Sequence, residues 1–263
     1  MSKFRINVCL PASATADVEV ALTTAMAPFD MNLSADYNPD GMWDWWRIDA
    51  GEDQRFVVKP EHDGDPRLIH SDPDAVGYQR QPLRCDGGPR GLLDFNASRR
   101  EALAQALSQW EAEQQDFQRL VADHPPAHPL TEFLARHAAD PDIYPREQAV
   151  ADHHTQPLVQ ALNHGSAWDR YPNLGLWVLG PNSDPISSFT QDPQPGFAHA
   201  EAWAIMATAL LTLNGEWIES DQLGSFTDVR TGEDKYDAYA RQATDYLAAL
   251  DDDCIIVRLL CHC

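Results

Sequence analysis

Lysine is nearly absent from this chain, and positive charge in general is scarce. The 263 residues include three lysines and 16 arginines against 41 acidic residues, which gives a formal net charge of −22. An acidic field of this size repels phosphate backbones and anionic lipids. We therefore expect neither nucleic acid nor a membrane surface as a direct partner.

Long apolar runs are also absent. No stretch approaches the roughly 18 consecutive apolar residues of a membrane span, and the N-terminal residues lack the apolar core of a signal peptide. The five cysteines are an odd number in a chain long enough to bury its own core, which argues against a disulfide framework. These features predict a cytoplasmic protein with reduced thiols.

The N-terminal part shows the patterns of strands and one helix. Apolar residues alternate over 4–10, the period of two that places one face of a strand on a core. Apolar residues then recur at helical spacing over 18–26, and acidic residues lie near the first turn, where they stabilise a helix. Two further strands are predicted at 42–49 and 54–58, joined across the turn at 50–52.

The C-terminal part repeats this theme. The Asn-Gly pair at 214–215 separates the β-prone runs 204–213 and 216–219 and predicts a hairpin, because Asn and Gly tolerate positive φ; a helix over the first run is the alternative. Apolar residues at helical spacing predict a helix over 236–250. A last strand is expected over 254–260.

A helical segment separates these two halves. Ser98 and Glu101 have the spacing of a capping box, and the helical patterns that follow are punctuated by prolines. We therefore divide the chain into an N-terminal half, 1–94, a helical insertion, 95–165, and a C-terminal half, 166–263. The prediction is an α+β fold in which two βαβ-like, ferredoxin-like halves form one mainly antiparallel sheet with the first and last strands side by side.

A tryptophan-rich strand is the best-marked candidate for a binding surface. In a regular strand Trp43, Trp45 and Arg47 share one face, while Asp44 and Trp46 share the other. Tryptophan can stack on planar ligands or hold a cation, and the charged neighbours supply polar contacts. The alternative is a core strand buried on both sides.

A second candidate is the short segment from Arg84 to Arg90. Asp86, Gly87 and Gly88 lie between the two arginines. Consecutive glycines let backbone N–H groups form an anion-binding concavity, which an arginine could complete for phosphate or carboxylate. The alternative is an ordinary tight turn.

Histidine and cysteine give only weak indications of a metal site. Neutral imidazole suits zinc, iron or nickel, but adjacent histidines point about 100° apart on a helix, and consecutive residues of a terminal strand face opposite ways. We predict no cofactor and no metal. The weak metal candidates are His137, His153, His154, Cys261, His262 and Cys263.

The chain resembles a family of uncharacterised actinobacterial and phage-associated proteins. The resemblance rests on the Asn-Pro-x-Gly-x-Trp-Asp-Trp-Trp-x-Ile motif at 38–48, on segments like 65–70 and 84–94, and on a short final strand with Cys-His. The sequence departs from the family pattern where Ala50 and Gly51 replace a pair of glycines. Because the family has no established activity, the resemblance implies none.

Three functions are compatible with these patterns. The first is a noncatalytic protein that binds a small molecule or a protein partner through the strand at 43–47 and adjacent loops. The second is a hydrolase or metal-dependent enzyme that uses the Asp86–Arg90 loop with histidines and aspartates of 124–164. The third is an acidic decoy that mimics nucleic acid, or a structural protein of a mobile element.

Overall fold

The computed structural model describes residues 3–33, 38–72, 80–163, 169–175, 179–219 and 232–263. The chain forms two compact units. The first, here called the sheet unit, consists of Met1–Leu103 and Ala198–Cys263, and the second, the helical unit, consists of Ala104–Phe197. No described helix is long and apolar enough to span a bilayer.

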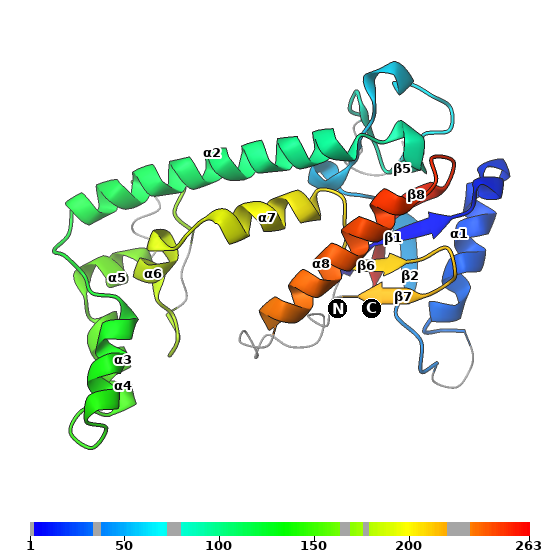
Figure 1. Cartoon of the computed structure of the whole chain (residues 1–263). Coiled ribbons are helices and arrows are strands. Elements are labelled where there is room, and N and C mark those ends of the chain that lie inside the picture. The colour runs from blue at the N-terminus through cyan, green and yellow to red at the C-terminus, as the bar shows by residue number, and fades with distance from the viewer. Residues whose placement is uncertain (1–2, 34–37, 73–79, 164–168, 176–178, 220–231) are drawn as a thin grey trace. The chain divides into compact units, whose positions relative to one another are not determined.

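One six-stranded sheet organises the sheet unit (Figure 1), and the predicted α+β class with a mostly antiparallel sheet is confirmed. Its main strand order is β2-β8-β1-β6-β7, and β5 pairs with β8. All pairs are antiparallel except β1 with β6. The strands are β1 (Lys3–Leu10), β2 (Trp45–Ile48), β5 (Gly87–Pro89), β6 (Ala209–Leu211), β7 (Trp217–Glu219) and β8 (Ile255–His262).

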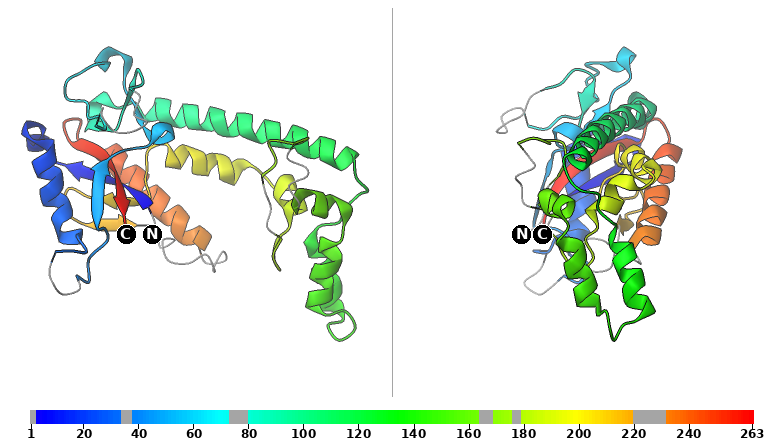
Figure 2. Two further views of the ribbon diagram at one scale, coloured as in Figure 1. Left: turned by 180° about the vertical axis from the view of Figure 1, so that it is seen from behind. Right: turned by 90° about the vertical axis from the view of Figure 1, so that its left-hand side faces the viewer.

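The first and last strands lie side by side, as predicted. They pair over their whole length, from Lys3 opposite His262 to Leu10 opposite Ile255. Figure 2 shows the start of β1 beside the end of β8. This pairing fits the ferredoxin-like pattern. The order of the hairpin strands departs from that pattern, because the first strand of the hairpin, β6, lies next to β1.

The sheet is covered by one helix on each face. Alternate residues of β1 and β8, such as Ile6 and Val257, pack on the side of α1 (Val18–Met26). Their neighbours, such as Cys9 and Ile256, pack on the side of α8, Gly232–Ala249. Burial on both faces explains why β8 is apolar at almost every position.

The Asn-Gly hairpin is confirmed, with shorter strands than expected. Gly215 has a φ of 77°, while Asn214 is not left-handed, and Thr212 and Glu216 close the loop by a backbone hydrogen bond of 2.9 Å. This is the three-residue loop that ends on a left-handed glycine. The first half of the predicted run, 204–208, forms a turn and a bend between β6 and the preceding helix α7 (Gln194–Trp203), so neither the longer strand nor the alternative helix over 205–213 forms.

Two local predictions differ from the structure. The strands expected at 42–49 and 54–58 do not pair with each other, because β2 joins β8 and β3 (Phe56–Val57) pairs with β4 (Arg84–Cys85) in a separate two-stranded sheet. The long helix α2 (Phe95–Ala122) begins before Ser98, because Asp94 caps it by accepting a hydrogen bond from the Ala97 N–H at 2.8 Å.

The helical unit has its own core, formed by residues such as Leu120, Leu158 and Leu162. Prolines begin two of its helices, where a missing N–H has no cost. Besides α2, its helices are α3 (Leu130–Ala139), α4 (Arg146–His154), α5 (Pro157–Asn163), α6 (Pro185–Thr190) and the start of α7. Short 3-10 helices in the sheet unit cover Ala12–Ala16, Ala27–Phe29, Glu52–Gln54, Pro60–His62 and Arg90–Leu92.

Candidate functional site

The three indoles of the tryptophan-rich segment lie on two faces of the sheet, two on one face and one on the other. Trp43 is buried on the α1 side with Trp46, and its Nε1–H donates to the carbonyl oxygen of Met26 at 3.2 Å. The prediction that Trp43 shares a face with Trp45 is therefore wrong. The chain bends at Asp44, and β2 begins only at Trp45, so strand alternation does not extend back to Trp43.

Trp45 lies on the opposite face, the α8 side, and is 36% exposed. Its ring stacks on the imidazole of His262, with 5.3 Å between ring centres and 9° between planes. The Nζ atom of Lys3 lies 5.7 Å from the centre of the indole. The strand register explains this row, because Lys3, His262 and Trp45 are direct partners across β1, β8 and β2. Asp44 fixes the imidazole through a contact of 2.6 Å with its Nδ1 atom.

The next row carries two arginines. Arg5 and Arg47 both face Leu260 from the neighbouring strands. Arg47 is more than half exposed and makes two hydrogen bonds to Asp49, from Nε at 3.1 Å and from Nη2 at 2.6 Å. Burial raises the pKa of Asp49, but hydrogen bonds from Arg47 and from the Gly51 N–H outweigh it and leave that pKa below its usual value.

We call Lys3, Arg5, Trp45, Arg47 and His262 the basic patch. In this part of the sheet three cationic residues lie on the same face as one exposed indole, whereas the chain as a whole is strongly acidic. The Nε atom of Arg5 is buried and has no hydrogen-bond partner among the described residues. Its guanidinium lies against Gly51, where an added Cβ would approach Nη2 to 2.3 Å. Guanidinium groups suit carboxylate or phosphate ligands, and Arg47 is the more exposed of the two arginines in the patch.

Below the patch, Arg258 is fully buried and has a structural role. Its side chain donates to the Oδ1 of Asn7 at 2.9 Å and to the carbonyl oxygens of Gln54, Ile205 and Met206. Burial, and next the charge of Arg5, lower the pKa of Arg258 to about 9. Because these protein groups already bind the guanidinium of Arg258, we do not count it among the ligand-binding groups of the patch.

Asp86 is also buried and supports the loop that borders the patch. Its Oδ1 accepts a hydrogen bond from the Ala50 N–H at 2.8 Å, and its Oδ2 accepts one from the Ser71 N–H at 2.7 Å. The Nε of Arg55 lies 3.7 Å from Oδ1. The sequence singled out Asp86 as a ligand contact, but in the structure the carboxylate is buried and accepts hydrogen bonds from the backbone N–H groups of Ala50 and Ser71.

The structure does not bring Arg84 and Arg90 together. Arg84 forms an ion pair with Glu101, while Arg90 donates from Nε to the Leu247 carbonyl oxygen at 3.2 Å and packs on Phe95. The two glycines between them form neither a concavity nor a tight turn. They belong to β5, and Gly87 lies so close to β8 that a Cβ would be 2.4 Å from the Ile256 carbonyl oxygen.

The weak metal candidates are divided between the units. His262 belongs to the basic patch, Cys261 is buried on the α1 side and Cys263 is exposed. In the helical unit, the Nδ1 of His137 lies 2.9 Å from the Tyr144 carbonyl oxygen. His153 and His154 are neighbours at the end of α4, and His164 lies outside the described residues.

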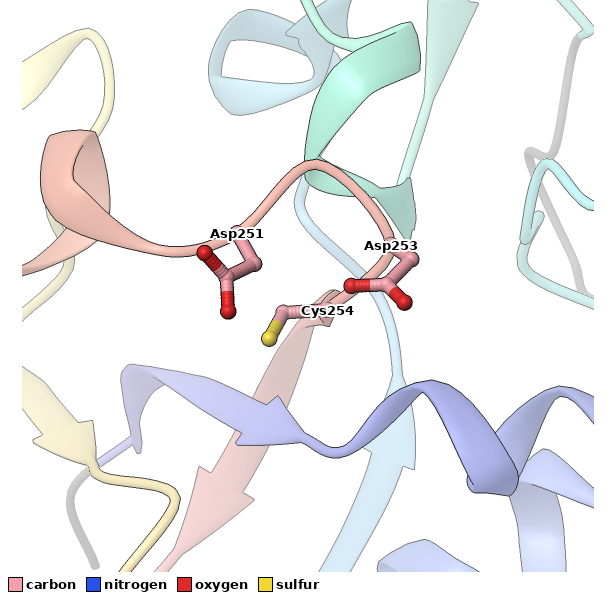
Figure 3. A group of neighbouring side chains, drawn as sticks. All are labelled: Asp251, Asp253 and Cys254. Carbon is pink, nitrogen blue, oxygen red and sulfur yellow. The ribbon is translucent and has the colours of Figure 1, made fainter.

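A different group brings three possible metal ligands together. Donor atoms of Asp251, Asp253 and Cys254 lie within 4.8 Å of one another in the turn before β8, and Figure 3 shows their side chains converging. Both aspartates are exposed, and burial followed by their negative charge raises the pKa of the Cys254 thiol. Because a metal needs the thiolate, this geometry alone does not make a site.

Lys3 and Arg5 are the patch residues that the sequence reasoning missed. They alternate with Phe4 and Ile6 in a strand that was recognised correctly, so their common face was available as a signal. Their partners on β2 and β8 come from distant parts of the chain, and the pairing could not be read from local patterns.

No model of a known protein family matches this chain, no curated protein matches it, and no solved structure matches it. The functional argument therefore depends on the geometry of the site.

Proposed function

We propose that this is a noncatalytic cytoplasmic binding protein whose basic patch holds a small anionic molecule with a planar ring. The observation that carries the proposal is the register of three strands. It places Lys3, His262 and Trp45 in one row and Arg5 and Arg47 in the next row on the same face. A stacking surface thus lies beside two guanidinium groups.

The dimensions of the patch favour a small ligand. Neighbouring strands lie about 4.8 Å apart and alternate residues of a strand about 6.7 Å apart, so the patch measures roughly 10 Å by 7 Å between Cα atoms. This is room for one phosphate or carboxylate group near Arg5 and Arg47 and for one ring near Trp45. A long polyanion would meet the acidic remainder of the chain, which repels it.

The other two hypotheses have less support from the contacts. The proposed enzyme would use the Asp86–Arg90 loop, but Asp86 holds backbone N–H groups and Arg90 holds the end of a helix. The decoy hypothesis relies on the overall charge of the chain alone. The resemblance to an uncharacterised family supplies no activity.

The proposal is tested by calorimetric titration with phenyl phosphate. Inorganic phosphate, which has the anion without the ring, and phenol, which has the ring without the anion, are titrated for comparison. We expect phenyl phosphate to bind most tightly. Replacing Arg47 by Ala should weaken binding roughly tenfold to a hundredfold, because a hydrogen bond to a charged group contributes about 1.5–3 kcal/mol. Trp45→Ala should reduce the preference for phenyl phosphate over inorganic phosphate.

Arg67→Ala is the matched control. Arg67 is half exposed and bonds to Asp65 two residues away, just as Arg47 bonds to Asp49, but it lies outside the patch. Equal binding by the Arg47 and Arg67 variants would exclude the patch as the site. Tighter binding of duplex DNA than of phenyl phosphate would mean that the ligand is nucleic acid rather than a small anion.

A further inference from the structure

Two adjacent histidines at the end of α4 contain three buried nitrogen atoms that have no hydrogen-bond partner among the described residues. They are the Nδ1 and Nε2 of His153, which is fully buried, and the Nε2 of His154; the carboxylate of Asp184 approaches the Nε2 of His153 only to 3.6 Å. A buried polar atom that is left unsatisfied destabilises the folded state. So many unsatisfied atoms on two neighbouring rings point to a ligand that accepts nitrogen lone pairs.

The two rings are close enough to share one ion. Their centres are 5.4 Å apart, with 58° between the ring planes. Two imidazoles that bind the same zinc ion at about 2.1 Å have ring centres roughly 5 Å apart. Consecutive residues of a helix point in different directions, and the sequence therefore predicted that the two imidazoles point apart. Because both residues lie at the end of α4, their rings nevertheless come close to each other.

Asp184 is placed to orient the first ring. Its Oδ1 lies 3.6 Å from the Nε2 of His153. Three donors hold this carboxylate in place: the N–H of Leu130, the N–H of Ser187 and the hydroxyl of Ser187. Histidines that bind metals usually direct their second ring N–H at a carboxylate, which leaves the other nitrogen with a free lone pair. Here that nitrogen is Nδ1.

We propose that the Nδ1 of His153 and the Nε2 of His154 bind a first-row transition-metal ion, with Zn²⁺ as the reference case. Asp184 is the positioning residue, and water completes the coordination. The ring of Phe133 packs against that of His153 in a T-shaped arrangement, with 5.7 Å between ring centres. Imidazole nitrogen suits zinc, and the acidic chain attracts cations. This inference concerns the helical unit and is independent of the basic patch.

The test uses the full chain with Cys263 replaced by Ser, because an exposed thiol would bind zinc itself. Calorimetry with Zn²⁺ alone should show one equivalent bound. His154→Ala should lower the affinity at least tenfold; the side chain is only partly buried, so the fold is retained. Asp184→Asn should keep the stoichiometry and weaken binding 10- to 100-fold, the usual effect of losing such a partner.

His137→Gln is the control, since its Nδ1 is already engaged by the Tyr144 carbonyl oxygen. This variant should bind like the parent. Long-range ¹H–¹⁵N spectra add a readout of structure: zinc should shift the Nδ1 of His153 and the Nε2 of His154. Unchanged affinity in His154→Ala overturns the proposal, as does loss of binding in Asp253→Asn, which would assign the ion to the turn before β8.

Discussion

The Nε of Arg258 donates a hydrogen bond of 2.9 Å to the Oδ1 of Asn7, and the two residues face each other across β8 and β1. The Nδ2 of Asn7 donates to the carbonyl oxygen of Ile205, which also accepts from the Nη2 of Arg258. These bonds connect the first strand, the last strand and the segment before β6. Because a slip by one residue would turn Arg258 into the apolar face under α1, the pair also fixes the register of the sheet.

Replacing Arg258 by Met should destabilise the protein by about 3–5 kcal/mol, because several buried acceptors lose a donor and each unsatisfied one costs about 1–3 kcal/mol. The change removes the donor to the Oδ1 of Asn7 and to the carbonyl oxygens of Gln54 and Met206, while the Ile205 oxygen keeps only its bond from Asn7. Arg258→Lys should not restore stability, since one ammonium group cannot span these acceptors. Urea unfolding measures both; full stability of the Lys variant would contradict this account of the network.

Trp43 and Trp45 should differ strongly in their effect on stability. Trp43→Ala removes a buried ring that packs under α1 and should cost about 3–5 kcal/mol. Trp45→Ala removes a partly exposed ring and should cost about 1 kcal/mol or less. Thermal melts of the two variants distinguish them. Equal and large losses would mean that Trp45 is a core residue and would weaken the proposed binding function.

Gly87 should not tolerate a side chain. In Gly87→Ala the new Cβ would lie 2.4 Å from the Ile256 carbonyl oxygen and 2.8 Å from the Val257 Cα, so β5 must move away from β8. Overpacking of this kind costs about 1–3 kcal/mol or more. Gly196→Ala is the control, because nothing lies within 4 Å of the added carbon in α7; it should be neutral or stabilise by up to about 1 kcal/mol.

His70 should make stability depend on pH in the mildly acidic range. Burial, followed by the charge of Arg80, lowers the pKa of His70 below 6.5, although Asp86 and Asp63 oppose the shift. Since the unfolded chain takes up this proton more readily, the contribution of His70 is greatest above pH 6.5 and is lost as the pH falls toward its folded pKa. Urea unfolding of the parent and of His70→Asn at several pH values should show less acid sensitivity in the variant.

Local patterns determined the first strand, α1, the hairpin and the last strand. These elements follow from the period of two over 4–10, the helical spacing over 18–26 and the Asn-Gly pair at 214–215, which act between residues close in sequence. Pairing of the first and last strands was also predicted. Of the basic patch, the sequence indicated Trp45 and Arg47.

Tertiary structure alone decided the rest of the site. The bend at Asp44 sends Trp43 into the core, which no alternation rule foresees. Lys3 and Arg5 join Trp45 and Arg47 only because β8, from the far end of the chain, lies between their strands. Gly87 and Asp86 likewise acquire their roles from β8 and from the loop at Ala50. Such contacts depend on which distant segments pair, and the free energy of that choice comes from burial and hydrogen bonding across the whole sheet rather than from any short stretch of sequence.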